Sequence, residues 1–180
     1  MRPPEEMETT RLRLRPVELR DAGAIFDTYA GQASPTHFMN FARHRNVSES
    51  EAFAQRCVDC WNADSAFPWA IIENSSGNLI GVIELRISPP KADFGYILGE
   101  AYWGRGFASE AARAVVAWAM AQPSIFRVWA TCHPGNTASG AVLRKAGLTY
   151  EATLANWEAR PQLGELAGAS HCYAWTKPTG

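Results

Sequence analysis

The sequence lacks an excess of charge of either sign. Its 180 residues carry 17 Lys and Arg against 18 Asp and Glu, which gives a formal net charge of −1 at pH 7. Proteins whose main task is to neutralise nucleic-acid phosphates usually carry a basic excess, so we expect no nucleic-acid partner. The length suits one globular domain over residues 1–180 and is short for two. Within that domain we expect residues 1–7 to be flexible.

The sequence also has no long apolar run. A membrane-spanning helix needs about 20 consecutive apolar residues, and the longest run, Ala114 to Ala121, is far shorter. The first ten residues contain acidic side chains where a secretory signal would have an apolar stretch. These absences predict a cytoplasmic protein that does not bind membranes.

Cysteine is scarce and does not form a convincing metal motif. Cys57 and Cys60 have the C-x-x-C spacing of zinc and redox sites, but both lie on an apolar stripe with helical spacing that includes Phe53. Each of the others has one adjacent histidine and no second ligand at finger-like spacing. We therefore expect no metal and interpret all the cysteines as structural thiols, namely Cys57, Cys60, Cys132 and Cys172.

Strand-like and helix-like segments alternate along most of the chain. Apolar patterns predict strands over Thr10–Arg15, Phe67–Ile72, Leu79–Ile87, Ala92–Leu98, Ile125–Thr131, Leu148–Leu154 and Ser170–Thr176. Helices are predicted over Ala22–Tyr29, after a capping box at Ser48 and Glu51, over Gly106–Met120 and over Asn136–Ala146. This order predicts an α/β fold, with a mixed sheet and helices on both faces.

Glycines cluster between the strand that ends at Leu98 and the helix that begins at Gly106. Such a junction gathers unpaired amides at a helix N-terminus, where anions bind well. Gly99 and Gly104 have the spacing of a P-loop, but Arg105-Gly106 replaces the required Lys-Ser/Thr. The dinucleotide fingerprint that begins at Gly104 lacks its third glycine. Both departures argue against ATP hydrolysis and nicotinamide chemistry, and a tight turn without ligand stays an alternative.

A third phosphate-binding pattern matches this junction. The segment WGRGFA at residues 103–108 resembles the Gln/Arg-x-x-Gly-x-Gly/Ala segment of the GNAT superfamily of N-acetyltransferases, with Trp103 at the usual Gln/Arg position. Residues 136–148 are similar to the Asn-x-x-Ser-x-x-Val-x-x-x-x-Gly-Phe helix of the RimJ/RimL branch, with Leu148 in place of Phe. Residues 8–15 are similar to the first strand of that branch. Three matching segments in the right order make the resemblance specific.

The resemblance implies a GNAT-type fold, in which a mixed, mostly antiparallel twisted sheet of about seven strands carries about four helices on its two faces. It also implies acetyl-coenzyme A as donor, with its diphosphate on the amides of residues 104–108. Two central strands of such a fold separate and expose backbone groups to the pantetheine arm. The residues expected to hold the coenzyme are Ile97, Leu98, Trp103, Gly104, Arg105, Gly106, Phe107, Ala108, Asn136 and Ser139.

The resemblance further suggests residues for the chemistry. Ser139 matches a serine proposed in the RimJ/RimL branch to protonate or hydrogen-bond the coenzyme sulfur, although it could simply help to cap its helix. Glu158 lies 158 − 139 = 19 residues further on, the spacing of a glutamate proposed as general base, and could instead be a solvated loop residue. Glu84 is a rival base within its apolar strand, and Asp93 is a weaker third candidate.

Two segments are expected near the acceptor. Residues 36–45 combine aromatic and basic side chains, and the small residues at 164–169 suggest a mobile loop over the acceptor site. We expect acetyl transfer from acetyl-coenzyme A to a primary amine, first of all a protein N-terminal α-amine, by direct attack without a covalent enzyme intermediate. Small amines such as amino acids, polyamines or antibiotics are alternative acceptors. A non-catalytic acyl-coenzyme A binding module and, more distantly, a nucleotide-dependent phosphotransferase are alternative functions, and the chain is expected to be a monomer or a homodimer.

Overall fold

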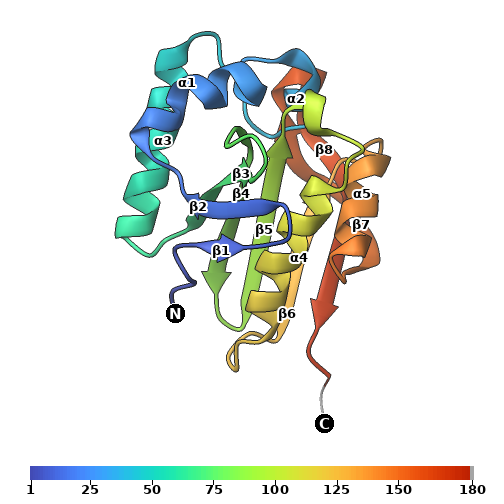
Figure 1. Cartoon of the computed structure of the whole chain (residues 1–180). Helices are drawn as coiled ribbons and strands as arrows, with labels where there is room; N and C mark the ends of the chain where they lie inside the picture. The colour runs from blue at the N-terminus through green and yellow to red at the C-terminus, as the bar shows by residue number, and fades with distance from the viewer. Residues whose placement is uncertain (179–180) are drawn as a thin grey trace.

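The structure is a computed structural model and describes residues 1–178. Over these residues the chain forms one eight-stranded sheet with the strand order β1-β2-β3-β4-β5-β6-β8-β7 (Figure 1). All neighbouring strands are antiparallel except β5 and β6, which are parallel. The strands are β1 (Met7–Glu8), β2 (Leu12–Pro16), β3 (Phe67–Glu73), β4 (Leu79–Ser88), β5 (Lys91–Leu98), β6 (Arg127–Cys132), β7 (Thr149–Arg160) and β8 (Glu165–Thr176).

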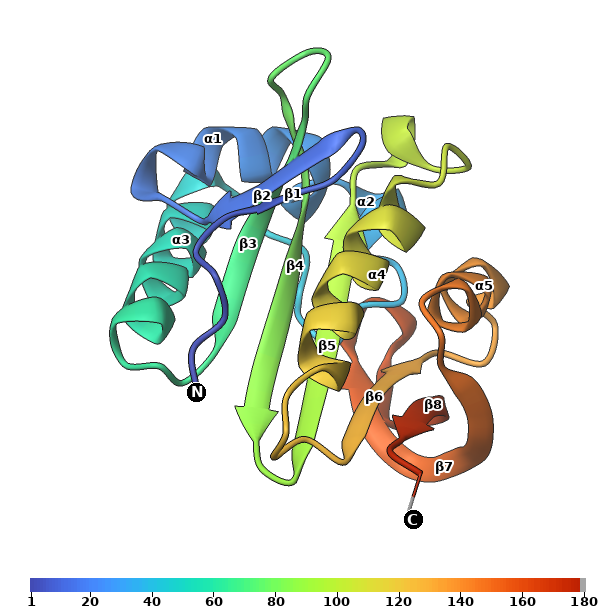
Figure 2. The same ribbon diagram turned by 60° about the horizontal axis from the view of Figure 1, so that its bottom comes forward.

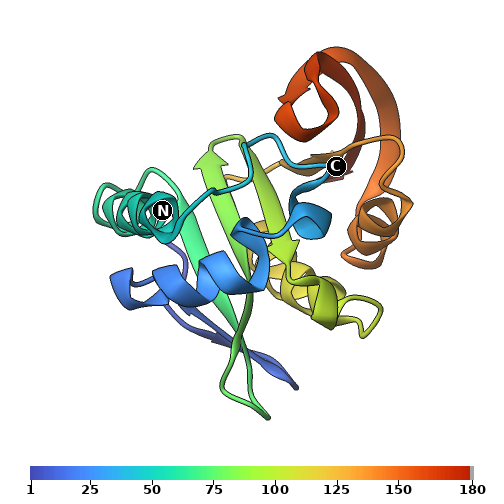
Figure 3. The same ribbon diagram turned by 90° about the horizontal axis from the view of Figure 1, so that it is seen from above.

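Helices cover both faces of this sheet, which confirms the predicted fold class. They are α1 (Ala22–Ile25), extended by a π-helical turn over Phe26–Ala30, α2 (Ala33–Thr36), α3 (Val47–Asn62), α4 (Phe107–Met120) and α5 (Thr137–Lys145). Short 3-10 turns cover Leu19–Asp21, Glu100–Tyr102 and Pro161–Leu163. Seen from above in Figure 3, α1 and α3 lie on one side of the central strands, and α4 and α5 lie on the other.

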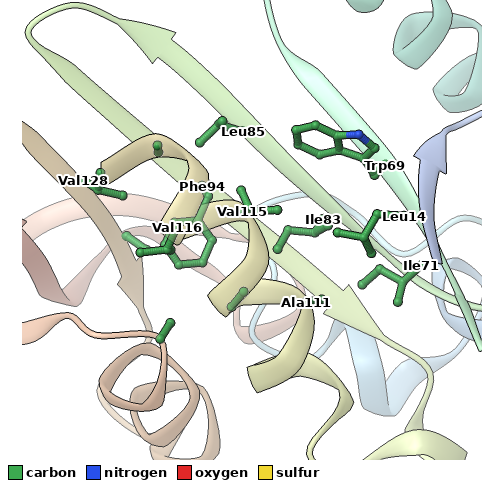
Figure 4. Packing of buried hydrophobic residues seen from close by; sticks show 14 of the residues in the cluster. Leu14, Trp69, Ile71, Ile83, Leu85, Phe94, Ala111, Val115, Val116 and Val128 are labelled. Atoms are coloured by element: carbon green, nitrogen blue, oxygen red, sulfur yellow. The ribbon is translucent and has the colours of Figure 1, made fainter. Parts of the chain in front are cut away.

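Two apolar cores follow from the alternation of side chains along the strands. Trp69 and Ile71 point to the face covered by α4 and α5, whereas Ala70 and Ile72 point to the face covered by α1 and α3. In the larger core, Val115 of α4 packs with Ile83 and Leu85 of β4 (Figure 4). Each such side chain contributes about 1.5–3 kcal/mol when fully buried. The central strands therefore form a rigid platform with a helix layer on either side.

Strands β5 and β6 separate after a short paired stretch. Their pairing covers Lys91, Ala92 and Asp93 of β5 and ends there, although β5 continues to Leu98 and β6 to Cys132. Figure 2 shows β6 turning away from β5 towards α5. The end of β5 is consequently paired only with β4, so its other backbone edge faces the gap between the two strands.

Three sequence-based predictions need correction or addition. The cap of α3 is Asn46, whose side chain accepts a hydrogen bond from the Glu49 amide, so the capping box predicted at Ser48 and Glu51 is wrong. Residues 164–169 are not a loop, because β8 begins at Glu165 and pairs with β7. The eighth strand, β1, has two residues and was too short to predict.

The first residues make contacts of their own. The Trp69 indole Nε1 donates to the carbonyl oxygen of Glu5 at 3.0 Å, and Arg2 pairs with Asp64 at 2.9 Å. β1 begins at Met7 and pairs with β2. The flexibility of residues 1–7 stays a prediction.

Candidate active site

A cavity of about 1070 Å³ extends from the N-terminus of α4, through the gap between β5 and β6, to the inner side of β7. The α2–α3 connection and the N-terminus of α5 complete its walls. Its lining includes nearly all residues that the sequence analysis assigned to the donor or to the chemistry, namely Glu84, Ile97, Leu98, Trp103, Gly104, Gly106, Phe107, Ala108, Asn136, Ser139 and Glu158. The exceptions are Arg105 and Asp93, which do not line it.

The N-terminus of α4 presents unpaired amides to this cavity. The first hydrogen bond of the helix runs from the Glu110 amide to the Gly106 carbonyl. Within residues 1–178, no protein acceptor is found for the amides of residues 104–109. Gly104 and Gly106 have φ angles of +71° and +82°. Residues other than glycine rarely adopt these backbone conformations. These two glycines turn the chain so that successive N–H groups converge at a helix N-terminus, the arrangement that favours an anion.

The side chains next to these amides point in other directions. Arg105 pairs with Glu73 at 3.1 Å, and its guanidinium lies 4.7 Å from the centre of the Phe107 ring. Trp103 is 47% exposed, and its indole Nε1 donates to the Leu98 carbonyl at 3.0 Å. The Arg105 charge is therefore engaged by Glu73, and Arg105 is not among the residues that line the cavity.

Ser139 lies in the first turn of α5, on the wall formed by that helix. The Asn136 side chain caps α5 by accepting a hydrogen bond from the Ser139 amide at 3.0 Å. The Ser139 hydroxyl oxygen accepts a second hydrogen bond from the Tyr96 hydroxyl of β5, at 3.1 Å. Because Tyr96 uses its own proton in this bond, the Ser139 hydroxyl keeps a proton of its own to donate, and the Cys132 sulfur is one acceptor within its reach. Burial raises the pKa of Tyr96 to about 12, so the phenol keeps that proton at neutral pH.

Cys132 lies at the end of β6 and also lines the cavity. Burial raises the pKa of its thiol, and a hydrogen bond with Ser139 partly opposes this effect. His133 is adjacent in sequence, but its ring stacks on Phe38 at 4.8 Å, and its Nδ1 accepts from the Gly135 amide. Nucleophilic cysteines need a lowered pKa, so the environment of Cys132 does not favour covalent catalysis.

Glu158, on β7, lines the opposite end of the cavity. Its Oε1 accepts a hydrogen bond from the Asn40 amide at 2.7 Å, and its Oε2 lies 3.4 Å from Nη2 of Arg160. Arg160 is fully buried and is held by Ser170 at 2.6 Å and Glu165 at 3.3 Å. The Glu158 side chain itself remains 27% exposed, so it is accessible from the cavity.

The two other carboxylates considered as bases are bound by arginines. Glu84 accepts from Arg86 at 2.6 Å, and Arg56 approaches its second oxygen at 3.5 Å. Asp93 also binds Arg86, whose Nε donates to it at 2.7 Å. Both oxygens of Glu84 are thus engaged by cations, although the residue lines the cavity.

The family described as the acetyltransferase (GNAT) domain matches residues 11–149. The chain belongs to the GNAT acetyltransferase family. As a GNAT protein it is an acetyl-CoA-dependent N-acetyltransferase, and its neighbours of known structure include members crystallised with acetyl-CoA or coenzyme A.

Individual GNAT relatives extend over most of the chain. This chain is 29% identical over 157 residues to the uncharacterized N-acetyltransferase p20 of Bacillus licheniformis. The matched region covers 86% of this chain and 88% of that protein. It is 27% identical over 156 residues to the [ribosomal protein uS5]-alanine N-acetyltransferase of Escherichia coli, with 83% and 80% covered. A structure of RimL, a ribosomal L7/L12 alpha-N-protein acetyltransferase in complex with coenzyme A, superposes with a TM-score of 0.83 at 22% identity, covering 96% and 98%.

Sequence reasoning missed several residues of this GNAT cavity. Cys132 was interpreted only as a structural thiol, although its position seven residues before Ser139, at a strand end, was a usable signal. Tyr96 could have been noticed from its place on the strand that leads into the glycine segment. Asn40 and Arg160 gave no local signal, because their importance depends on contacts between distant parts of the chain.

Over residues 1–178, no group of three or more His, Cys, Asp or Glu side chains is arranged to hold a metal ion. None of the helices in that range is both long enough and apolar enough to span a bilayer.

Proposed function

We propose that this N-acetyltransferase acetylates the N-terminal α-amine of a protein, with Glu158 as general base and Ser139 as hydrogen-bond donor to the coenzyme sulfur. The main support is the continuous cavity that joins the free amides of α4 to the accessible carboxylate of Glu158. The acceptor class is supported by the relatives, since RimL and the uS5-alanine enzyme, which act on ribosomal proteins by their names, match most of the chain.

At the donor end, we propose that the amides of residues 104–108 bind the coenzyme diphosphate. Hydrogen bonds to a charged group contribute about 1.5–3 kcal/mol each, and a helix N-terminus adds a favourable dipole. The open backbone edge at Ile97 and Leu98 would hold the pantetheine arm in the gap between β5 and β6. Asn136 shapes this wall by capping α5. Added charge from Arg105 stays a prediction, because its guanidinium pairs with Glu73.

At the acceptor end, the proposed reaction needs a neutral amine. An α-amine has an ordinary pKa of about 7.7–8.0, so a large part of it is protonated at neutral pH. Glu158 accepts this proton, directly or through a water molecule, and the amine then attacks the thioester carbonyl. Acetyl-coenzyme A supplies the acetyl group.

Loss of the coenzyme thiolate needs a donor at the sulfur. The Ser139 hydroxyl is suited to this task, because Tyr96 donates to its oxygen and the hydroxyl retains its own proton, which the coenzyme sulfur would accept in place of the Cys132 sulfur. Oriented donors that stabilise a developing charge typically contribute two to three orders of magnitude in rate. After attack, the nitrogen loses its second proton to solvent as the C–N bond becomes an amide bond. The C–S bond breaks, and the coenzyme thiolate leaves with a hydrogen bond from Ser139. The acetyl group passes directly from sulfur to nitrogen, so no covalent enzyme intermediate is required.

The deciding experiment uses acetyl-coenzyme A with a panel of amines. The panel contains peptides that begin with Ala or Ser, the same peptides with a blocked N-terminus and an internal Lys, and polyamines, amino acids and aminoglycosides. Release of coenzyme A is followed with a thiol reagent, and the modified atom is located by mass spectrometry. We expect acetylation of free peptide N-termini only. Faster turnover of a small amine than of every peptide would replace the proposed acceptor class.

Variants separate an enzyme from a binding module. We expect Ser139→Ala and Glu158→Gln to lower kcat by about 10²-fold, the range for loss of a general acid or base. Calorimetric titration should show that both variants still bind acetyl-coenzyme A, while Mg-ATP does not bind. Glu84→Gln and Asp93→Asn test the rival bases, and a larger loss of kcat in either variant than in Glu158→Gln would transfer the role.

A further inference from the structure

The acceptor end of the cavity is closed by a segment without regular structure, residues 37–45, which we call the acceptor strap. It connects α2 to α3 and lies beside the end of the β7–β8 hairpin (Figure 1). Phe38, Asn40 and Phe41 of the strap line the cavity. Such a segment lacks the repeating backbone hydrogen bonds of a helix or strand, so contacts with the rest of the fold must offset the entropy cost of ordering it.

Gln162, in the turn between β7 and β8, supplies three of these contacts. Its side-chain amide donates to the carbonyl oxygens of Thr36 at 2.6 Å and Phe41 at 2.9 Å. Its Oε1 accepts from the amide of Arg43 at 3.3 Å. One side chain thus uses both ends of its amide group to hold the strap against the hairpin that carries Glu158.

Asn40 projects from the held strap to Glu158. Its Nδ2 donates to Oε1 of the carboxylate at 2.7 Å, across a sequence separation of 118 residues. The other oxygen of the carboxylate faces Arg160, which is itself fixed by Ser170 and Glu165. A partly exposed glutamate otherwise has considerable rotamer freedom. Each of the two donors contacts a different oxygen of the carboxylate, and together they favour one orientation of the side chain.

We propose that Asn40 is a positioning residue for acetyl transfer, orienting the Glu158 carboxylate towards the acceptor amine, and that Gln162 maintains this contact by holding the acceptor strap. The proposal rests on the proposed role of Glu158 as base. The Asn40 amide does not take up a proton at neutral pH, so its role is to orient Glu158 and not to act as the base. A displacement of about 1 Å in a reacting group lowers the rate by up to about 10²-fold. Loss of the Asn40 contact should therefore lower kcat.

A double-mutant cycle tests this dependence. Asn40→Ala, Glu158→Gln and the combined variant are compared with wild type, with the amine from the panel that turns over fastest. We expect Asn40→Ala to lower kcat about tenfold and to leave the Kd of acetyl-coenzyme A unchanged. In the Glu158→Gln background the same substitution should change kcat by less than about twofold, because residues that act as a unit are not additive. Asn74→Ala, in the β3–β4 turn outside the cavity, is the matched control.

Two further variants separate positioning from folding. Asn40→Asp keeps the size of the side chain but places a second carboxylate beside Glu158, so it should lower kcat more than Asn40→Ala does. Gln162→Ala should lower kcat and increase hydrogen exchange of the strap amides, while Asn40→Ala should leave most of those amides protected. Unchanged thermal unfolding in the Asn40 variants excludes a general loss of structure.

The outcomes distinguish this proposal from the proposed function. An equal loss of kcat from Asn40→Ala in both backgrounds would show that Asn40 acts independently of Glu158 and would overturn the positioning role alone. Wild-type kcat in Glu158→Gln would remove the base and the positioning role together. An acceptor other than a peptide would change the proposed acceptor class and leave the cycle valid, since it is measured on whichever amine is used.

Discussion

Gly81 of β4 packs so closely against Ile97 of β5 that a methyl group in place of its hydrogen would overlap the Ile97 carbonyl oxygen. The same methyl group would lie 3.0 Å from the Cα of Leu98, also a backbone atom that cannot rotate away. β4 and the end of β5 can therefore approach this closely only because Gly81 has no side chain. The other edge of this part of β5 faces the cavity.

Gly81→Ala should consequently force the two strands apart. We expect a loss of about 1–3 kcal/mol in the free energy of unfolding, as for other overpacked sites, and weaker binding of acetyl-coenzyme A. Urea unfolding and calorimetry measure the two effects. Gly95→Ala is the control for stability, because a Cβ at Gly95 meets nothing within 4 Å. Equal stability of both variants would show that the contact is relieved without cost.

Gly106 tests the turn that presents the amides of α4. Its φ of +82° is unfavourable for alanine by about 1–2 kcal/mol, whereas asparagine tolerates this region better. We expect Gly106→Ala to destabilise the protein by about that amount and to weaken acetyl-coenzyme A binding, with a smaller effect for Gly106→Asn. If the two variants bind the coenzyme equally, the left-handed conformation is not what the site requires.

Tyr96→Phe removes only the hydroxyl that donates to Ser139. The proposed role of Ser139 predicts a decrease of kcat by about three- to tenfold, which corresponds to one hydrogen bond. The Kd of acetyl-coenzyme A should stay the same, because the ring and its packing are retained. Steady-state kinetics and calorimetry give these values, and a changed Kd with constant kcat would indicate a role in binding.

Alkaline pH should lower the free energy of unfolding through the buried thiol of Cys57. Burial raises its pKa from 9.0 to about 12, so the folded state keeps a proton that the unfolded state releases above pH 9. The stabilisation is complete below pH 9 and is lost as pH rises towards 12, by up to about 1.4 kcal/mol per pH unit. Burial also raises the pKa of Tyr96 from 10.0 to about 12, so this group causes a similar loss of stability above pH 10. We expect Cys57→Ala to show a flatter decline between pH 9 and 10 in urea unfolding; a slope equal to that of wild type would contradict the assignment.

Local signals predicted the backbone geometry at the starts of α4 and α5 well. The glycines of residues 104–106 adopt the conformations that a strand-to-helix turn requires, and Asn136 caps α5 as its sequence motif indicates. Both features depend on residues only a few positions apart. The placement of Ser139 on the cavity wall follows from that cap.

Competing local signals explain the errors. Asn46 and Ser48 are both good N-caps, and the extended backbone at Asn46 decides between them, while the Ser48 hydroxyl merely donates to the Asn46 side chain. Residues 164–169 have small side chains typical of a loop, but pairing with β7 makes most of them a strand. The Asn40–Glu158 contact joins segments 118 residues apart, and no pattern of neighbouring residues in the sequence indicates it. Long-range pairing is the information that a single sequence does not contain.

The two ends of the cavity differ in how the chain encodes them. The end with the free amides is built by one continuous stretch that runs from β5 to α5, whereas the end with Glu158 is assembled from the acceptor strap and the β7–β8 hairpin. Changes in these two peripheral pieces can accumulate without disturbing the stretch between them. The architecture thereby separates the part of the chain that presents the free amides from the parts that would meet different acceptors.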